Sequence, residues 1–212
     1  MDPNHLPTLQ GICSAAKAQK QELVNRHGVG TDIPPVLATT AARQPLGCYP
    51  LGDDDGAVAG TVTSAIALSD ADLAVVVQEV YASADHVGCD LAPRFAAGDP
   101  TVTEGLLFIA LPRGGHPKWR LERYRYVGRN IDWLGTARTV DDDIVGPYAP
   151  LAEHAYRLQQ RRGGPAPLTR GARLLHTGTC QHDDTLFIHF VLQQSCPCGS
   201  ARPMNECCAL RN

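Results

Sequence analysis

Large aromatic side chains are scarce in this chain of 212 residues, which contains two Trp, four Phe and six Tyr. A hydrophobic core must therefore be built mainly from Ala, Val, Leu and Ile. No apolar run approaches the roughly 20 residues that a membrane-spanning helix requires. The sequence also lacks a P-loop, a GxSxG nucleophile elbow, an HExxH pair and a GxGxxG turn after an expected strand. The enzyme classes that depend on these motifs gain no support.

The chain also lacks the features of a secreted protein. Residues 1–7 contain an acid, two prolines and no apolar run, unlike a secretory signal. We therefore expect a cytoplasmic protein without stable disulfides, although its eight cysteines are an even number. The formal net charge of −3 argues against generic binding to nucleic acid. Four cysteines occur singly and are expected to be small buried or half-buried residues: Cys13, Cys48, Cys89 and Cys180.

The other four cysteines form a cluster near the C-terminus with the spacing C-x-C-G-S-x6-C-C. Pro197 and Gly199 favour a sharp turn that lets two thiolates face one ion. Four thiolates without an open position are typical of structural zinc, whereas catalytic zinc keeps one position for water. Disulfide or redox use of the same residues is the alternative. The expected ligands of the structural Zn²⁺ are Cys196, Cys198, Cys207 and Cys208.

This cluster resembles the SEC-C motif, a short zinc-binding module found at the C-terminus of the preprotein translocase motor SecA and in many uncharacterised bacterial proteins. All four ligand positions match, as do Pro197, Gly199 and Ser200. The resemblance covers about thirteen residues and implies a structural zinc site. Residues 201–206 differ from the glycine, lysine pair and aromatic that family members usually carry there. We therefore carry over the ligands and not the family's partners, such as the chaperone SecB or the ribosome.

The first third of the chain predicts one helix followed by an irregular segment. Residues 11–27 mix Ala, Leu and Val with Lys, Gln and Glu and end at Gly28, which is typical of a helix. Residues 28–60 are rich in proline and glycine and favour an irregular course. The run of three aspartates at 53–55 lacks the alternation of a calcium loop and favours a solvated turn.

A second helix is expected over residues 70–84. Ser69 is a suitable N-cap, and Asp70 and Asp72 suit the positive end of the helix dipole. Apolar residues then recur at helical spacing: Leu73, Val76, Val77 and Val80.

Strands dominate the second half of the sequence. The continuous apolar run at 106–111 is typical of a buried strand, and residues 119–127 and 131–140 have the composition of strands. Short links between the three predict an antiparallel meander. A helix over 148–160 and a hairpin over 172–192 are expected to follow.

These elements predict an α+β protein with a mostly antiparallel sheet of about five strands, two or three helices and a small C-terminal zinc knuckle. Residues 1–60 are expected to form an irregular N-terminal extension with a short helix. Residues 61–194 would form the core domain, and residues 195–212 the knuckle.

The expected meander is locally basic, because six Lys and Arg residues between Arg113 and Arg129 accompany Glu122 as the single acid. Arginine and aromatic side chains can contact phosphates and stack on bases. The candidate binding surface consists of Lys118, Trp119, Arg120, Arg123, Tyr124, Arg125 and Tyr126. Strand alternation divides these side chains between two faces, with odd-numbered residues from Trp119 to Arg125 opposite the even-numbered ones. The alternative is an edge hairpin whose charges maintain solubility.

We favour a zinc-binding interaction or adaptor protein over an enzyme. Its expected partner is a protein, with RNA or the ribosome as further options, and the sequence does not indicate an oligomeric state. The alternative is a metal-dependent, hydrolase-like enzyme with its site on the hairpin at 172–192, because histidine and aspartate can bind catalytic metals. The candidate residues of that site are His176, Asp183 and His189.

Overall fold

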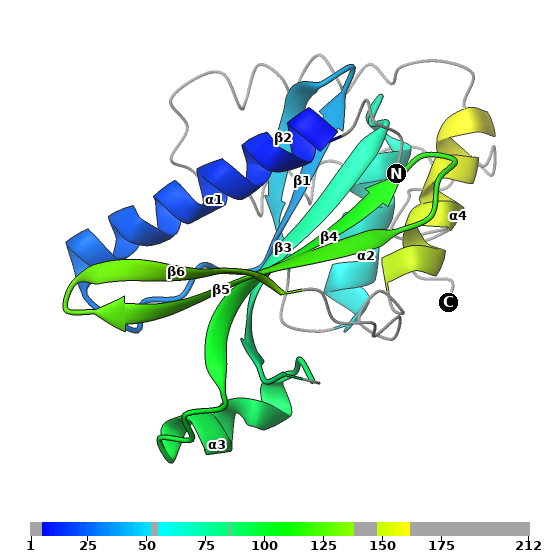
Figure 1. The fold of residues 1–212 in the computed structure, drawn as a ribbon. Coiled ribbons are helices and arrows are strands. Elements are labelled where there is room, and N and C mark those ends of the chain that lie inside the picture. Colours follow the sequence, from blue (N-terminus) through cyan, green and yellow to red (C-terminus); the bar gives the residue numbers. More distant parts are fainter. Residues whose placement is uncertain (1–5, 52–54, 85, 138–147, 162–212) are drawn as a thin grey trace.

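The computed structural model describes residues 6–51, 55–84, 86–137 and 148–161. These ranges form an open sheet of six strands in the order β2-β1-β3-β4-β5-β6, in which all neighbouring strands are antiparallel (Figure 1). The predicted α+β class is confirmed, with six strands in place of about five. In chain order the elements are α1 (Leu6–His27), β1 (Val36–Ala41), β2 (Gln44–Pro50), α2 (Asp55–Ala67), β3 (Leu73–Ala82), the 3₁₀ turn η1 (Cys89–Leu91), α3 (Ala92–Ala96), β4 (Thr103–Pro112), β5 (Lys118–Val127), β6 (Asn130–Ala137) and α4 (Tyr148–Arg161).

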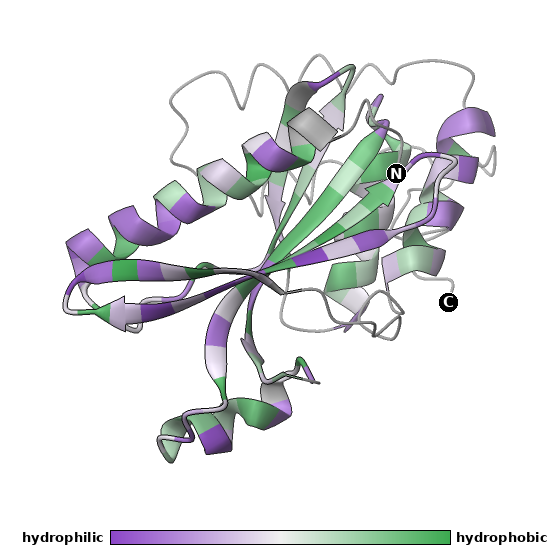
Figure 2. Ribbon diagram, viewed as in Figure 1, coloured by the Kyte–Doolittle hydropathy of each residue, from purple (hydrophilic) through white to green (hydrophobic). Residues whose placement is uncertain are grey.

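Helices cover both faces of the sheet. Helix α1 packs on one face, against Val75 on β3 and Phe108 on β4, while α2 and α4 pack on the other, against Val76 and Ile109. Figure 2 shows the apolar residues gathered along β3 and β4, the two central strands. Because both faces of these strands are covered, the segments 73–77 of β3 and 106–111 of β4 are continuous apolar runs without polar alternation.

The prediction of a helix over residues 70–84 is wrong, because strand β3 occupies Leu73–Ala82. A continuous apolar run contains residues at helical spacing as well as at strand spacing, so periodicity alone cannot separate the two. The β-branched run from Val75 to Val77 favours a strand, since these side chains pack well on a pleated surface. Ser69 does not cap a helix; its Oγ accepts a hydrogen bond from the Ala71 amide in the turn after α2 (3.2 Å).

The irregular course expected for residues 28–60 is also wrong, because this segment contains β1, β2 and the start of α2. The β1–β2 hairpin turns at Ala42 and Arg43, both of which have positive φ (46° and 67°), in a turn that lacks the usual glycine. Helix α2 is buried throughout from Ala59 to Ala67, and its small apolar and hydroxyl side chains form no amphipathic pattern. Strand β1 pairs with β3, and α2 continues across residue 60.

Within the described ranges, the first helix, the antiparallel meander and the helix after it are confirmed. Helix α1 begins at Leu6, earlier than expected, and ends at His27. Strands β4, β5 and β6 form the expected antiparallel meander, and α4 spans Tyr148–Arg161. The hairpin expected at 172–192 and the cysteine cluster lie outside the described residues.

Candidate functional site

A buried ammonium group lies between α1 and the sheet. Lys20 projects from α1, and its side chain is 0 % exposed. Its Nζ atom donates to the carbonyl oxygen of Thr31 (2.6 Å), forms an ion pair with Oε1 of Glu79 on β3 (2.5 Å) and lies 3.9 Å from Oδ1 of Asp32. A lysine is almost never fully buried unless it is paired. The three oxygen atoms around Nζ supply that pairing.

Two tyrosine rings of β5 complete the surroundings of Lys20. Its Nζ lies 5.4 Å from the ring centroid of Tyr124 and 5.9 Å from that of Tyr126. The two rings contact each other edge to face, with centroids 5.6 Å apart. Ring faces attract a cation, so the aromatic pair further stabilises the buried charge.

The buried carboxyl groups around Lys20 have raised pKa values. Burial raises the pKa of Glu79 to about 7, and the hydrogen bond with Asp32 adds to the effect while Lys20 opposes it. Burial alone would lower the pKa of Lys20, but the hydrogen bond and charge of Glu79 outweigh it and raise that pKa. Burial also raises the pKa of Glu104 on β4, against the opposing charge of Lys20. The cluster therefore combines a persistent cation with a carboxyl group that titrates near neutrality.

A second lysine of α1 makes a similar contact one turn away. Lys17 Nζ lies 2.9 Å from Oε2 of Glu122 on β5 and 4.3 Å from the ring centroid of Trp133 on β6. Glu122 also accepts hydrogen bonds from Arg120 Nε (2.5 Å) and Thr136 Oγ1 (2.8 Å). Burial alone would raise the pKa of Glu122, but these three donors outweigh it and hold that pKa below its ordinary value.

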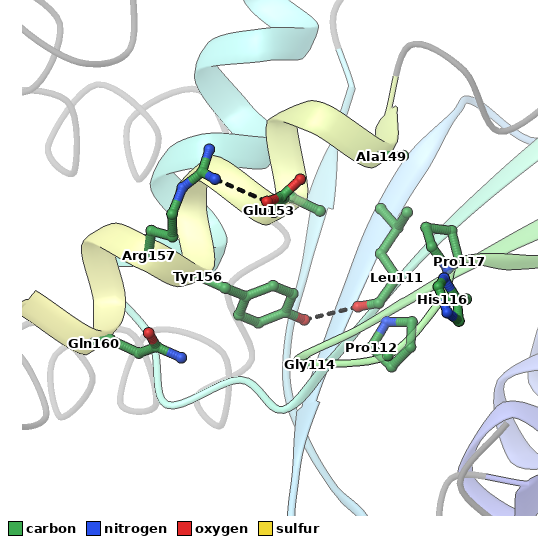
Figure 3. A pocket seen from close by; sticks show the side chains of 12 residues that line it. Leu111, Pro112, Gly114, His116, Pro117, Ala149, Glu153, Tyr156, Arg157 and Gln160 are labelled. Atoms are coloured by element: carbon green, nitrogen blue, oxygen red, sulfur yellow. Dashed lines mark hydrogen bonds and ion pairs between the residues drawn. The ribbon is translucent and has the colours of Figure 1, made fainter.

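The opposite face of the sheet carries a pocket of about 440 Å³ between α4 and the turn that joins β4 to β5 (Figure 3). Tyr156 projects from α4 across the pocket, and its hydroxyl group donates to the carbonyl oxygen of Leu111 (2.8 Å). Arg157 and Glu153 form an ion pair along the α4 side (2.8 Å), and His116 lies on the side of the turn.

The volume of this pocket suits a small molecule or a single large side chain. Its inner wall is apolar, with Ala149 and Ala152 leaving space beside Leu111. Arg157 and Glu153 on the rim neutralise each other. A bound group would therefore be held by apolar contacts and hydrogen bonds, and less by a net charge. No nucleophile lies beside a base here, so the lining does not define a reaction.

The proposed zinc ligands Cys196, Cys198, Cys207 and Cys208 and the candidates His176, Asp183 and His189 lie outside the described residues. Within the described ranges, no group of three or more His, Cys, Asp or Glu side chains is arranged to hold a metal ion.

The isolated cysteines differ in their environments. Cys13 on α1 is 1 % exposed, which confirms the expected burial, and burial raises the pKa of its thiol to about 11. A thiol of this kind is unreactive at neutral pH. Cys48 on β2 is exposed, so the expectation of a buried or half-buried residue is wrong there. Strand β2 is an edge strand, and alternation along it directs Cys48 outward while Tyr49 is buried.

The aromatic residues of the meander are divided between the two faces of the sheet, as the alternation predicted. Trp119 packs toward the face covered by α2 and α4, whereas Tyr124 and Tyr126 pack toward α1. Tyr124 is 1 % exposed and belongs to the core. Arg125 forms an ion pair with Asp132 (2.8 Å). The structure therefore does not gather the seven candidate residues into one surface.

Sequence reasoning missed both Lys20 and its partner Glu79. Glu79 was missed because residues 70–84 were predicted as a helix, whereas Glu79 lies on β3. Lys20 did carry a signal, because it occupies the same helical stripe as Ala16 and Val24, four residues away on either side. A charged residue in an apolar stripe predicts a buried partner.

No protein-family model matches this chain, and comparisons with curated proteins and with solved structures also gave no match. Its class therefore rests on its own architecture, an α+β protein with an open antiparallel sheet covered by helices. None of the helices in the described ranges is both long and apolar enough to cross a membrane.

Proposed function

We propose that this protein is a cytoplasmic zinc-binding interaction protein. The observation that carries the proposal is the spacing C-x-C-G-S-x6-C-C, which supplies four thiolates for one structural Zn²⁺. A fully ligated zinc ion orders a short segment that cannot bury enough apolar surface to fold alone. Such a segment presents a shaped surface to a partner and performs no reaction.

A protein partner agrees better with the described residues than RNA does. Two of the arginines in the candidate surface, Arg120 and Arg125, are engaged with Glu122 and Asp132. Tyr124 is buried against Lys20 and unavailable for stacking on a base. Binding to single strands depends on free cations and exposed aromatic rings. These pairings weaken the RNA alternative and leave a protein as the partner that we propose.

Elemental analysis of protein purified without added metal tests the zinc site. We expect one zinc per chain in the full-length protein and in Cys48→Ser, a matched control at an exposed cysteine of β2. Cys198→Ser and a chain truncated after Gln194 should both lose the zinc. Retention of a metal after truncation would contradict the assignment and favour the enzyme alternative, whose candidate residues are His176, Asp183 and His189.

The interaction is tested by comparing proteins captured by the full-length chain and by Cys198→Ser under identical conditions. We expect a defined protein to bind the full-length chain and to be lost from the variant. A parallel titration with a single-stranded oligoribonucleotide at low and high salt tests the RNA alternative, because phosphate contacts release counterions. Tight binding that falls steeply with salt would overturn the preference for a protein partner.

A further inference from the structure

Glu104, near the start of β4, is a half-buried carboxylate that forms no ion pair or hydrogen bond within the part of the chain that the structure describes. It lies on the face covered by α1, as do Leu106 and Phe108 further along the strand. It pairs with Tyr124 on β5, and beyond this pair β5 continues with β6 alone (Figure 1). A carboxylate in this position has lost part of its hydration without gaining a partner. It is therefore available to a cation from outside the chain.

Carboxyl groups outnumber cations around Glu104. We call Asp32, Glu79 and Glu104 the carboxylate cluster, and the cation among them is Lys20. Lys20 contacts Glu79 (2.5 Å) and lies 3.9 Å from Asp32, and its charge also acts on Glu104. Three carboxylates and one ammonium group leave two negative charges unbalanced. Since the other lysine on this side of α1, Lys17, pairs with Glu122, a further cation at the cluster has to come from elsewhere.

Tyr124 provides an independent sign of a missing donor. Its side chain is 1 % exposed, and its hydroxyl group is buried without a hydrogen-bond partner among the described residues. The hydroxyl group faces the cluster, because the charges of Glu79 and Glu104 add to the effect of burial and raise its pKa. Buried hydroxyl groups are normally hydrogen-bonded. An N–H group that enters beside Glu104 can satisfy the carboxylate and this hydroxyl oxygen together.

The acceptors of this site suit an organic cation and not a metal ion. Within the described ranges, His, Cys, Asp and Glu side chains are nowhere grouped in the way that a metal ion requires. Ammonium and guanidinium groups instead carry several N–H donors that reach separate acceptors. The rings of Tyr124 and Tyr126 already face the ammonium group of Lys20, and such rings favour cations in general. The chemistry of the site therefore matches an alkylammonium or guanidinium group.

Exposed apolar residues beside the cluster indicate that the cation belongs to a protein. Val29 and Val127 are two of the three large apolar side chains that are exposed within the described ranges. Val29 lies three residues before Asp32, and Val127 follows Tyr126 at the end of β5. A hydrogen bond from Gln21 to the Arg129 carbonyl joins α1 to the β5–β6 turn next to Val127 (3.1 Å). A free amine leaves these side chains uncovered, whereas a polypeptide that carries the cation can cover them.

We propose that the carboxylate cluster binds the lysine or arginine side chain of a protein partner, which pairs with Asp32 and Glu104. Asp32 is 74 % exposed and meets the cation first, while Glu104 holds it closer to the sheet. Hydrogen bonds between two charged groups are shorter and stronger than neutral ones, so a single side chain makes a specific contact. This inference rests on the protein partner proposed above but not on the zinc site.

An NMR titration of the full-length, ¹⁵N-labelled protein tests the proposal at constant ionic strength. The probes are three capped pentapeptides that carry lysine, arginine or norleucine between pairs of glycines. We expect the lysine or arginine peptide to shift the backbone amides around residues 32, 104 and 124 in a saturable way. The norleucine peptide keeps the aliphatic stem without the charge and should bind about 10-fold more weakly or less. Equal binding of all three peptides, or no saturable shift with either basic peptide, would overturn the proposal.

Substitutions identify the groups that hold the cation. Glu104→Gln should weaken binding of the basic peptide by about 10-fold, because a neutral amide replaces the paired charge. Asp32→Asn should also weaken it, and its exposed position keeps the proposal testable if Glu104→Gln fails to fold. The matched control is Glu153→Gln, at an exposed position of α4 on the opposite face, which should bind as the wild type does. Wild-type affinity in both Glu104→Gln and Asp32→Asn would refute the assignment.

The variant Cys198→Ser separates this inference from the zinc site. It should bind the basic peptide with wild-type affinity, even if it no longer captures a partner protein. Loss of peptide binding in Cys198→Ser would place the site in the C-terminal segment and overturn the assignment to the carboxylate cluster.

Discussion

Substitution of Lys20 by methionine provides a direct measure of the buried ammonium group. Methionine retains the length of the lysine stem but removes the charge and the hydrogen bond to the Thr31 carbonyl (2.6 Å). Glu79 then loses its partner at 2.5 Å and remains beside Asp32. Burial and Asp32 still favour the protonated carboxyl group, so Glu79 adds a proton, which avoids the full cost of an unpaired buried charge.

The magnitude follows from the contacts that are lost. Each hydrogen bond to a charged group contributes about 1.5–3 kcal/mol, and the added apolar burial of methionine offsets part of that loss. We expect Lys20→Met to lower the free energy of unfolding by about 2–4 kcal/mol at pH 7. In Glu79→Gln the same substitution should cost less, with a coupling energy of about 1–3 kcal/mol between the two positions.

Urea unfolding at fixed pH measures both quantities, with circular dichroism and tryptophan fluorescence as separate probes. Lys118→Met, at an exposed residue of β5, is the matched control and should change the unfolding free energy by less than about 0.5 kcal/mol. A Lys20→Met variant as stable as the wild type within about 0.5 kcal/mol, or a double variant without coupling, would show that the buried ion pair does not stabilise the protein.

Three further outcomes are expected. The lowered pKa of Glu122 means that its ionised form stabilises the fold above its ordinary pKa, and this stabilisation is lost as the pH falls. Glu122→Gln should therefore make stability less dependent on pH in the acidic range, which urea midpoints between about pH 3 and 5 would measure. Cys198→Ala should abolish zinc binding but leave the main thermal transition in place, as calorimetry would show, because zinc supplies the folding energy of a short segment. Gln159→Met should cost about 1–3 kcal/mol in urea unfolding, because the buried amide donates to three backbone carbonyls that would lose their donor, those of Ile66, Ser69 and Ala71.

Elements with strong local signals were predictable. Helix α4 has a clear apolar stripe and begins and ends close to the expected residues. The β4–β5–β6 meander is marked by its apolar run and by the positive φ of Gly114 and Gly128 in its turns. Alternation along β5 also placed Trp119 and Tyr124 on opposite faces correctly.

Elements in uniformly small or apolar stretches were not predictable. Helix α2 has no polar face to reveal its period, and β3 is buried on both sides. In such segments, tertiary packing selects the conformation, because local spacing is compatible with more than one structure. The β1–β2 hairpin was not predicted, because its turn is formed by Ala42 and Arg43 and lacks the glycine that usually marks such a turn.

The candidate site also combines features that local sequence predicts with features that depend on tertiary packing. The sequence by itself determined the class of the fold, the meander and the spacing of the four C-terminal cysteines, since each depends on residues that are close together along the chain. Only the tertiary structure decided which face each helix covers and that Lys20 meets Glu79 beneath α1. These residues are far apart in the sequence, and their contact depends on strand pairing that places β3 in the centre of the sheet. A buried charge balance of this kind arises from packing, and no local pattern specifies its partner.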